Sequence, residues 1–353
     1  MKILITGGAG FAGSAIALKL KTQYPSYSIT AFDNLKRRGS ELNLPRLKAG
    51  SIDFQHGDIR CKEDLFFDQE FDLIIDASAE PSVLAGITSP VEQVVNNNLM
   101  GTINCLELAK KHKAAFLFLS TSRVYPIAKL EEVKFEESDT RFNWIDEQVL
   151  PGVSSKGVSE YFPLSGSRSF YGTTKLASEL LIQEYCELAG VKAVINRCGV
   201  LTGPWQMGKV DQGVIVLWIA RHIFQGKLGY FGYGGTGKQV RDILHIDDLY
   251  RLVDWQIHNI DKINGEIFNV GGGADCSVSL QELTRLCEKA TGNKIQIDTV
   301  TENRVADIRI YLTDNTYVTQ KTGWEPQINP EQIVKDITEW IIENRSILEP
   351  ILK

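Results

Sequence analysis

The first half of the chain alternates short runs of apolar residues with longer stretches in which apolar residues recur at helical spacing. The apolar runs predict strands at 2–6, 28–33, 51–58, 72–77, 114–120 and 192–197. The helical spacing predicts helices at 11–21, 91–112 and 171–188. Strands that are apolar throughout are typical of a parallel sheet buried on both faces. We therefore predict an α/β fold with a doubly wound parallel sheet and right-handed crossovers.

The pattern changes twice further along the chain. Residues 129–168 are polar and carry glycine and serine clusters, which predicts an irregular insertion. Beyond about residue 200 the segments become shorter and mixed. We predict a larger domain at 1–200, which contains the insertion, and a smaller mixed α/β lobe at 201–353. Some exchange of chain between the two is expected.

Composition and charge disfavour several classes of function. The chain has 353 residues and a formal net charge of −6, with a pI near 5.5, which disfavours a surface for nucleic acid or acidic membranes. Its six cysteines form no Cys-x-x-Cys pair, as is typical of reduced thiols in the cytosol. Its five histidines lack the spacing of metal ligands, so we predict no metal site. The sequence shows no signal-peptide pattern and no run of ~20 apolar residues that would span a membrane.

Three glycines directly follow the first predicted strand. Gly7, Gly10 and Gly13 have the spacing Gly-x-x-Gly-x-x-Gly where a strand meets a helix. Glycines there permit a tight turn, let the backbone approach a pyrophosphate and allow the helix to pack on the strand. The start of the helix, at Phe11 and Ala12, favours the negative charge of the phosphates. The motif predicts a dinucleotide site in a Rossmann-type sheet.

Carboxylates at the ends of the next two strands bear on the choice of dinucleotide. Asp33 ends the second strand, 20 residues after Gly13. A carboxylate there accepts hydrogen bonds from ribose hydroxyls and repels a 2′-phosphate, so we predict NAD in preference to NADP. Arg37 and Arg38 follow closely and leave NADP open. Asp58 ends the third strand and is placed to meet the adenine. The other predicted cofactor contacts are Asn34, Ile59, Ala77, Ser78, Ala79, Asn98 and Cys198.

Tyr171 and Lys175 stand four residues apart in a predicted helix, after the strand that ends in Thr121. A phenol has a pKa of about 10 and is a poor base at pH 7. An ammonium one helical turn away and a positive nicotinamide both favour the phenolate. Tyr171 would then take a proton from a sugar hydroxyl while the carbon loses hydride, and Thr121 would hydrogen-bond the same oxygen. We predict Thr121, Tyr171 and Lys175 as the catalytic residues.

Together these motifs resemble those of the extended short-chain dehydrogenase/reductase family of nucleotide-sugar epimerases and dehydratases. Residues 237–248, 304–309 and 323–326 resemble downstream signatures of that family, so the resemblance covers nearly the whole chain. It implies a nucleotide-diphosphate sugar as substrate, with Arg241 and Arg309 binding the diphosphate. The predicted substrate contacts are Arg123, Gln212, Tyr230, Gln239, Arg241 and Arg309.

The two positions after Thr121 separate the branches of the family. By the resemblance, dehydratases carry an Asp-Glu pair there to eliminate water, whereas this chain has Ser122 and Arg123. We therefore predict an epimerase, in which bound NAD transiently oxidises a ring carbon and the hydride returns to the other face. The stretches at 120–125, 139–142, 211–213 and 237–245 resemble CDP-tyvelose (CDP-paratose) 2-epimerases, which implies C2 of a CDP-sugar.

Two other classes of function stay open from the sequence. One is a UDP-sugar 4-epimerase or a related NAD-dependent sugar-nucleotide dehydrogenase. The other is a non-catalytic regulator that senses the dinucleotide, although regulators often lose the Tyr or the Lys that this chain keeps. Two departures from the family bear on the sugar: Val200 replaces a common Asn, and Asp76 replaces a common His. The resemblance also implies a homodimer or homotetramer, formed through the helices at 93–112 and 171–188.

Overall fold

The computed structural model describes residues 1–208 and 212–353. They form two compact units, and the chain passes between the units several times. The first unit comprises Met1–Val124, Ser169–Arg197 and Leu249–Phe268, and the second comprises Tyr125–Arg168, Cys198–Asp248 and Asn269–Lys353. The predicted domain division near residue 200 stays a prediction. Asp211, in one stretch that resembles the 2-epimerases, lies outside the described residues.

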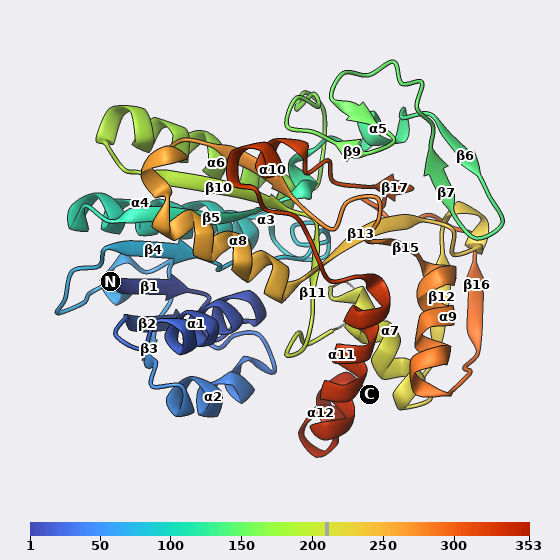
Figure 1. The fold of residues 1–353 in the computed structure, drawn as a ribbon, viewed down its shortest axis with the longest axis horizontal. Coiled ribbons are helices and arrows are strands. Elements are labelled where there is room, and N and C mark those ends of the chain that lie inside the picture. Colours follow the sequence, from blue (N-terminus) through green and yellow to red (C-terminus); the bar gives the residue numbers. More distant parts are fainter. Residues whose placement is uncertain (209–211) are drawn as a thin grey trace. The chain divides into compact units, whose positions relative to one another are not determined.

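The first unit is built on a seven-stranded sheet with the order β14-β10-β5-β4-β1-β2-β3. The strands from β10 to β3 are labelled in Figure 1. The pairs from β5 to β3 are all parallel. This confirms the predicted doubly wound α/β fold, and β14 is a strand from beyond residue 200. The strands are β1 (Lys2–Thr6), β2 (Ser28–Asp33), β3 (Asp53–His56), β4 (Leu73–Asp76), β5 (Ala115–Thr121), β10 (Ala193–Cys198) and β14 (Ile267–Val270).

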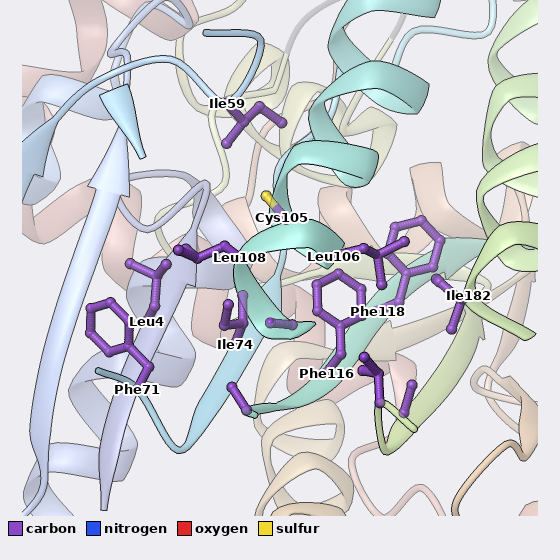
Figure 2. Close-up of a cluster of buried hydrophobic side chains, with 14 of the residues drawn as sticks. Leu4, Ile59, Phe71, Ile74, Cys105, Leu106, Leu108, Phe116, Phe118 and Ile182 are labelled. Atoms are coloured by element: carbon purple, nitrogen blue, oxygen red, sulfur yellow. The ribbon is translucent and has the colours of Figure 1, made fainter. Parts of the chain in front are cut away.

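The helices of this unit pack on a sheet whose strands, apart from the edge strand β3, are buried over most of their length. In a strand, successive side chains point to opposite faces, so a continuous apolar run supplies two cores. One core is drawn in Figure 2, where side chains of β1, β4 and β5 meet those of α4 and α6. Burying each of these side chains stabilises the fold by about 1.5–3 kcal/mol. Its members with no more than 1% exposure include Leu4, Ile74, Cys105, Leu106, Phe116, Phe118 and Ile182.

The predicted helix at 91–112 is not continuous. It consists of α3 (Val91–Val95), a π-helical turn η3 (Asn96–Met100) and α4 (Gly101–His112). Single π turns inside helices are frequent at functional sites, and η3 carries Asn98. The other helices of the unit are α1 (Phe11–Gln23), α2 (Leu44–Ala49), α6 (Phe170–Ala189) and most of α8 (Ile246–His258).

The order of the strands reverses between β1 and β4. From β1 the chain extends the sheet towards β2 and β3, and from β4 it extends towards β5, β10 and β14. In doubly wound sheets, ligands bind outside the carboxyl ends of the strands at this point. Thr6 and Asp76 are the last residues of β1 and β4 and are register partners. The glycine motif and the segment 77–79 therefore leave the sheet at the same place.

The second unit centres on β13 (Val240–His245), which pairs in parallel with β11 and β17 and antiparallel with β15. The insertion predicted as irregular contains two short hairpins, β6–β7 and β8–β9. Within the described ranges, no helix combines the length and the apolar character needed to cross a membrane. The remaining elements are α5 (Ile127–Glu131), β6 (Phe135–Glu137), β7 (Phe142–Trp144), β8 (Val153–Ser154), β9 (Gly157–Val158), β11 (Val200–Thr202), α7 (Val214–Ile223), β12 (Leu228–Phe231), β15 (Ser277–Ser279), α9 (Leu280–Thr291), β16 (Ile297–Val300), β17 (Ile310–Tyr311), α10 (Thr316–Thr322), α11 (Pro330–Glu343) and α12 (Arg345–Leu352).

The central strand β13 contains a fully buried carboxyl group, that of Asp242. Its Oδ2 accepts hydrogen bonds from the backbone N–H groups of Gly273, at 3.1 Å, and Thr313, at 3.2 Å. A Cβ added to Gly271 would lie 2.2 Å from the same oxygen. Backbone groups without intervening side chains therefore pack against this carboxyl group. Burial raises the pKa of Asp242 to about 6.

We expect Asp242→Asn to remove a pH dependence of stability. Asn keeps a carbonyl oxygen for the two N–H donors but cannot ionise. Because an unfolded Asp titrates near 3.8 and Asp242 near 6, the native protein keeps a proton between about pH 4 and 6 that the unfolded chain has lost. The contribution of Asp242 to stability therefore falls as pH rises through that window, by about 3 kcal/mol.

The free energies of unfolding of both proteins are measured in urea at about pH 4.5 and 7.5. Relative to the wild type, Asp242→Asn should be more stable at the higher pH than at the lower pH. A difference between the two proteins that does not change with pH would contradict this assignment.

Candidate active site

The glycine motif forms a tight turn between β1 and α1. Gly7 has a φ of +66°, and the Gly10 N–H donates to the Gly7 carbonyl at 2.9 Å. A Cβ added to Gly13 would lie 2.3 Å from the Gly7 oxygen, and one added to Gly7 would lie 2.7 Å from the Ala77 oxygen. No side chain fits at either position, which leaves the backbone N–H groups at the start of α1 open to approach. The loop therefore fits the pyrophosphate of a dinucleotide.

Asp33 lies at the end of β2 with both carboxyl oxygens oriented by the backbone. Its Oδ2 accepts from the Ala9 N–H at 3.1 Å, and its Oδ1 accepts from the Leu35 N–H at 2.8 Å. Burial raises the pKa of Asp33, and the backbone donors act in the opposite direction. A carboxylate can accept about four hydrogen bonds, so Asp33 keeps capacity for a ribose hydroxyl. The arrangement fits the adenosine ribose of NAD, and ribose binding by Asp33 stays a prediction.

Asp58 and Asn34 form a second polar group near the ends of β2 and β3. The Asn34 amide donates to Asp58 Oδ2 at 2.9 Å, and Arg60 donates from Nη2 and Nε to the two carboxyl oxygens at 2.5 and 2.9 Å. The Arg60 guanidinium holds the pKa of Asp58 well below its usual range. Ile59 is buried against Gly101, where an added Cβ would lie 2.3 Å from the Ile59 Cδ1. Contact of these residues with the adenine stays a prediction.

Asn98 in η3 connects the segment after β4 to the catalytic helix α6. Its Oδ1 accepts from the Glu80 N–H at 2.7 Å, and its Nδ2 donates to the Thr174 hydroxyl at 3.2 Å. That hydroxyl donates in turn to the Tyr171 carbonyl at 2.8 Å. The Asn98 amide therefore has internal partners and links Glu80 to the first turns of α6.

The three predicted catalytic residues come from α6 and the end of β5 in the first unit. Tyr171 and Lys175 lie one helical turn apart in α6, and both are buried. The Lys175 ammonium donates to the Leu119 carbonyl at 2.9 Å and lies 4.2 Å from the centre of the Phe118 ring. Thr121 is the last residue of the same strand. The lysine is thus anchored to the strand that carries the catalytic hydroxyl.

A buried ion pair supports this arrangement from inside the fold. Glu179, one turn after Lys175, accepts from Arg197 Nη2 at 2.7 Å and from its Nε at 3.0 Å. The Ser120 hydroxyl donates to Glu179 Oε1 at 2.5 Å. Glu179 and Arg197 are 1% and 3% exposed. The pair therefore joins α6, β10 and the residue before Thr121, and sequence reasoning did not predict it.

In the second unit, Arg309 lies among three aromatic rings. Its guanidinium carbon is 4.0 Å from the centre of the Phe135 ring, 5.1 Å from Tyr233 and 5.6 Å from Phe142. The Glu131 Oε2 lies 3.6 Å from Arg309 Nη2, and its Oε1 accepts from the Arg309 backbone N–H at 2.6 Å and the Tyr233 hydroxyl at 3.2 Å. Among the described residues, the guanidinium makes this ion pair but no hydrogen bond. Its donors are therefore well suited to receive phosphate oxygens.

Arg241 differs from Arg309, although the sequence predicted one role for both. Its Nη2 donates to the Asp307 carboxylate at 2.8 Å and to the Ile308 carbonyl at 2.6 Å, and its Nη1 donates to the Val240 carbonyl at 2.8 Å. These bonds already use donors that a diphosphate would need. We therefore expect Arg309 to contribute more than Arg241 to binding of a diphosphate.

Two further predicted substrate residues lie directly before β13 and in β12. Gln239 is 7% exposed and donates from Nε2 to the Phe231 carbonyl at 2.8 Å. Its Oε1 has no hydrogen-bond partner within the described part of the chain. Tyr230 shares a hydrogen bond of 2.8 Å with the Thr284 hydroxyl, and burial raises the pKa of Tyr230. Both side chains are thus oriented by the protein itself.

The predicted site residues divide between the two units. Apart from Cys198, at the end of β10, the predicted cofactor residues are in the first unit together with the catalytic residues and Arg123. The backbone N–H of Arg123 donates to Thr121 Oγ1 at 3.2 Å. The second unit holds Cys198 and the remaining substrate residues, Gln212, Tyr230, Gln239, Arg241 and Arg309. Their roles stay predictions.

Comparison with known proteins gives the family. Residues 3–271, which is most of the chain, match the NAD dependent epimerase/dehydratase family. The chain belongs to the NAD-dependent epimerase/dehydratase family. It is therefore an enzyme of this family, and NAD is its cofactor. The predicted family and cofactor are confirmed.

Relatives of this family member include both epimerases and dehydratases. It is 31% identical over 349 residues to a CDP-paratose 2-epimerase of Salmonella typhi, covering 96% of this chain and 99% of the relative. It is 29% identical to a dTDP-glucose 4,6-dehydratase of Mycolicibacterium smegmatis, covering 99% and 96%.

Two solved structures show the same fold with ligands bound. A UDP-glucuronic acid 4-epimerase from Bacillus cereus, in complex with UDP-glucuronic acid and NAD, has a TM-score of 0.79 and 25% identity over 98% of this chain and 100% of that one. A dTDP-glucose 4,6-dehydratase from Bacillus anthracis, in complex with NAD, has a TM-score of 0.77 and 25% identity over 100% of both chains. Family membership alone therefore does not decide between epimerase and dehydratase.

Proposed function

We propose that this enzyme is an NAD-dependent nucleotide-sugar epimerase that acts at C2 of a CDP-3,6-dideoxyhexose, interconverting CDP-paratose and CDP-tyvelose. The observation that carries the proposal is the pair of residues after Thr121. Ser122 and Arg123 stand where dehydratases of the family have two acids. Neither a hydroxyl nor a guanidinium is a carboxylic acid that could protonate a leaving hydroxyl. The likeness to a CDP-paratose 2-epimerase over almost the full chain supports the same choice.

The mechanism follows from the residues of the first unit. When bound, NAD supplies reversible hydride transfer at the sugar carbon. Tyr171 Oη takes the proton of the C2 hydroxyl as that carbon is oxidised, and Lys175 one turn away favours the phenolate. The Thr121 hydroxyl hydrogen-bonds the same oxygen. After the keto sugar has turned over, Tyr171 returns the proton to this oxygen, so acid and base are one residue.

A competing reaction within the family is epimerisation at C4 of a UDP-sugar. It is favoured by the likeness to a solved UDP-glucuronic acid 4-epimerase. The same three catalytic residues would serve it, because only the carbon presented to them changes. The two proposals therefore differ in how the nucleotide and sugar are held and not in how the proton moves.

Incubation with a panel of nucleotide sugars tests the proposal. Purified enzyme is mixed with CDP-, UDP-, GDP- and dTDP-sugars, and the ratio of epimers is followed by NMR. We expect CDP-paratose and CDP-tyvelose to reach equilibrium from either side without net reduction of added NAD. Turnover of UDP-sugars at C4 with no reaction of CDP-sugars would replace this proposal with the competing one. Stoichiometric NADH formation would identify a dehydrogenase.

Binding of the diphosphate by Arg309 gives a further prediction. Arg309→Met should weaken binding of CDP by about 10- to 100-fold, because hydrogen bonds to charged groups contribute about 1.5–3 kcal/mol. Arg309→Lys should recover part of the loss, since it keeps the charge without the planar fork. Isothermal titration with CDP and separately with NAD checks this, and NAD affinity should not change. Equal CDP affinity in all three proteins would contradict the assignment.

We also propose that the enzyme is a homodimer or a dimer of dimers formed through α3, η3, α4 and α6. Large apolar side chains are exposed on these elements, namely Met100, Leu180 and Leu188. Its place in the cytosol is a further proposal, which the six cysteine thiols support.

A further inference from the structure

Asp76 is a fully buried carboxyl group at the point where the strand order reverses. It ends β4, and its register partner Thr6 ends β1 directly before the glycine motif. The proposed reaction gives it no role. Among the described residues, it forms no ion pair with Lys, Arg or His, and its partners are hydroxyl and N–H groups. Burying a carboxyl group without a cationic partner costs free energy, which the hydrogen bonds to Asp76 must offset.

Three hydroxyl groups from three segments converge on Asp76. Thr6 Oγ1 donates to Oδ1 at 2.8 Å, and Ser78 donates to the same oxygen from Oγ at 2.5 Å and from its backbone N–H at 3.1 Å. Thr102 Oγ1, in the first turn of α4, donates to Oδ2 at 2.9 Å. Thr6 and Thr102 are 0% and 1% exposed, so water cannot replace these bonds. One carboxyl group therefore joins β1, the segment after β4 and α4.

Two of these segments form the dinucleotide loop. Thr6 leads into Gly7, whose positive φ begins the tight turn. Ser78 lies directly against that glycine, because a Cβ on Gly7 would come within 2.8 Å of the Ser78 Cα. By binding Thr6 and Ser78 through one oxygen, Asp76 sets the spacing between the two walls of the loop.

We propose that Asp76 is a positioning residue for NAD, which holds the loop at Gly7 and the segment at Ser78 in their binding geometry before the cofactor arrives. Preorganisation of this kind raises affinity by reducing the ordering cost of binding. A neutral imidazole has one acceptor nitrogen and so cannot receive three hydroxyls. The hydroxyls of Thr6, Ser78 and Thr102 therefore require a carboxylate such as that of Asp76, and a His at this position could not accept all three. The proposal concerns cofactor binding and does not depend on which sugar the enzyme uses.

A matched pair of substitutions tests the proposal. Val has the shape of Thr but lacks its hydroxyl, so Thr6→Val and Thr102→Val each remove one buried hydroxyl donor to Asp76. Only Thr6 leads into the dinucleotide loop. The dissociation constants for NAD and for CDP are measured by isothermal titration on cofactor-free protein, and the urea midpoint is measured on the same preparations. We expect Thr6→Val to weaken NAD binding about 5- to 10-fold and Thr102→Val less than about 2-fold. Both should lower the midpoint to a similar extent and leave CDP affinity unchanged.

Asp76→Ala, which removes the acceptor itself, should weaken NAD binding by about 10-fold or more, and Asp76→Asn, which keeps one acceptor oxygen, should recover part of this. If Asp76→Ala does not fold, the NAD affinities of Thr6→Val and Thr102→Val still test the proposal. Unchanged NAD affinity in Thr6→Val would overturn the proposal. So would an equal loss of NAD affinity in both threonine variants, because that would mark a structural role only. Absence of CDP-sugar turnover in wild-type enzyme that binds NAD would count against the proposed function instead, and would leave the role of Asp76 in NAD binding untouched.

Discussion

Tyr171→Phe should lose turnover by about 10²- to 10⁴-fold while the enzyme still binds NAD. The substitution removes one oxygen from a buried side chain and leaves the ring, and therefore the packing of α6, in place. Without the phenol, no group on α6 takes the proton of the sugar hydroxyl in the proposed mechanism. Initial rates of epimerisation by NMR, together with NAD affinity by titration, separate the loss of chemistry from a loss of cofactor.

The same helix provides a matched control for Tyr171→Phe. The Tyr185 hydroxyl donates to the Glu107 carboxylate, and burial raises the pKa of Tyr185 to about 12. It has no role in the proposed reaction, so Tyr185→Phe should keep wild-type turnover. If Tyr171→Phe turned over at the rate of Tyr185→Phe, the assignment of Tyr171 as acid and base would be wrong.

Glu179→Ala should cause the largest loss of stability among the substitutions considered, about 3–5 kcal/mol. It would leave the buried guanidinium of Arg197 without its carboxylate and remove the acceptor of the Ser120 hydroxyl. Because Ser120 precedes Thr121 and Glu179 lies one turn after Lys175, we also expect residual folded protein to turn over more slowly. The free energy of unfolding in urea measures the first effect.

An exposed ion pair in α11 provides the comparison. Lys335 and Glu339 lie 3.9 Å apart with side chains that are 61% and 58% exposed. Solvent screens such pairs, so Glu339→Ala should change stability by no more than about 0.5 kcal/mol. A loss in Glu179→Ala as small as that in Glu339→Ala would show that the buried pair does not hold the catalytic helix.

Local sequence patterns were sufficient to predict most of the strands and the dinucleotide loop of the first unit. Apolar runs such as 2–6 and 114–120 predicted its strands because a strand buried on both faces leaves a continuous signal. The glycine motif and Asp33 predicted the dinucleotide loop because their chemistry lies within one strand-turn-helix segment. The π turn at Asn96–Met100 was not predictable, since a single extra residue in a helical turn hardly changes the apolar periodicity.

The unpredicted parts of the site depend on contacts between distant segments. Glu131 and Phe135 surround Arg309 although they lie in an insertion that looked irregular from its polar composition. Arg197 and Glu179 pair between a strand and a helix, with no spacing that marks them in the sequence. Asp76 was noticed only as a departure from the family, and its three hydroxyl partners became apparent in the fold.

In the proposed mechanism, the hydride taken from C2 returns to C2. A CDP-3,6-dideoxyhexose labelled with deuterium at C2 can be epimerised in ordinary water and the product examined by NMR. We expect the product epimer to keep its deuterium at C2. Replacement of that deuterium by solvent hydrogen would contradict hydride return, and with it the proposed roles of NAD and Tyr171.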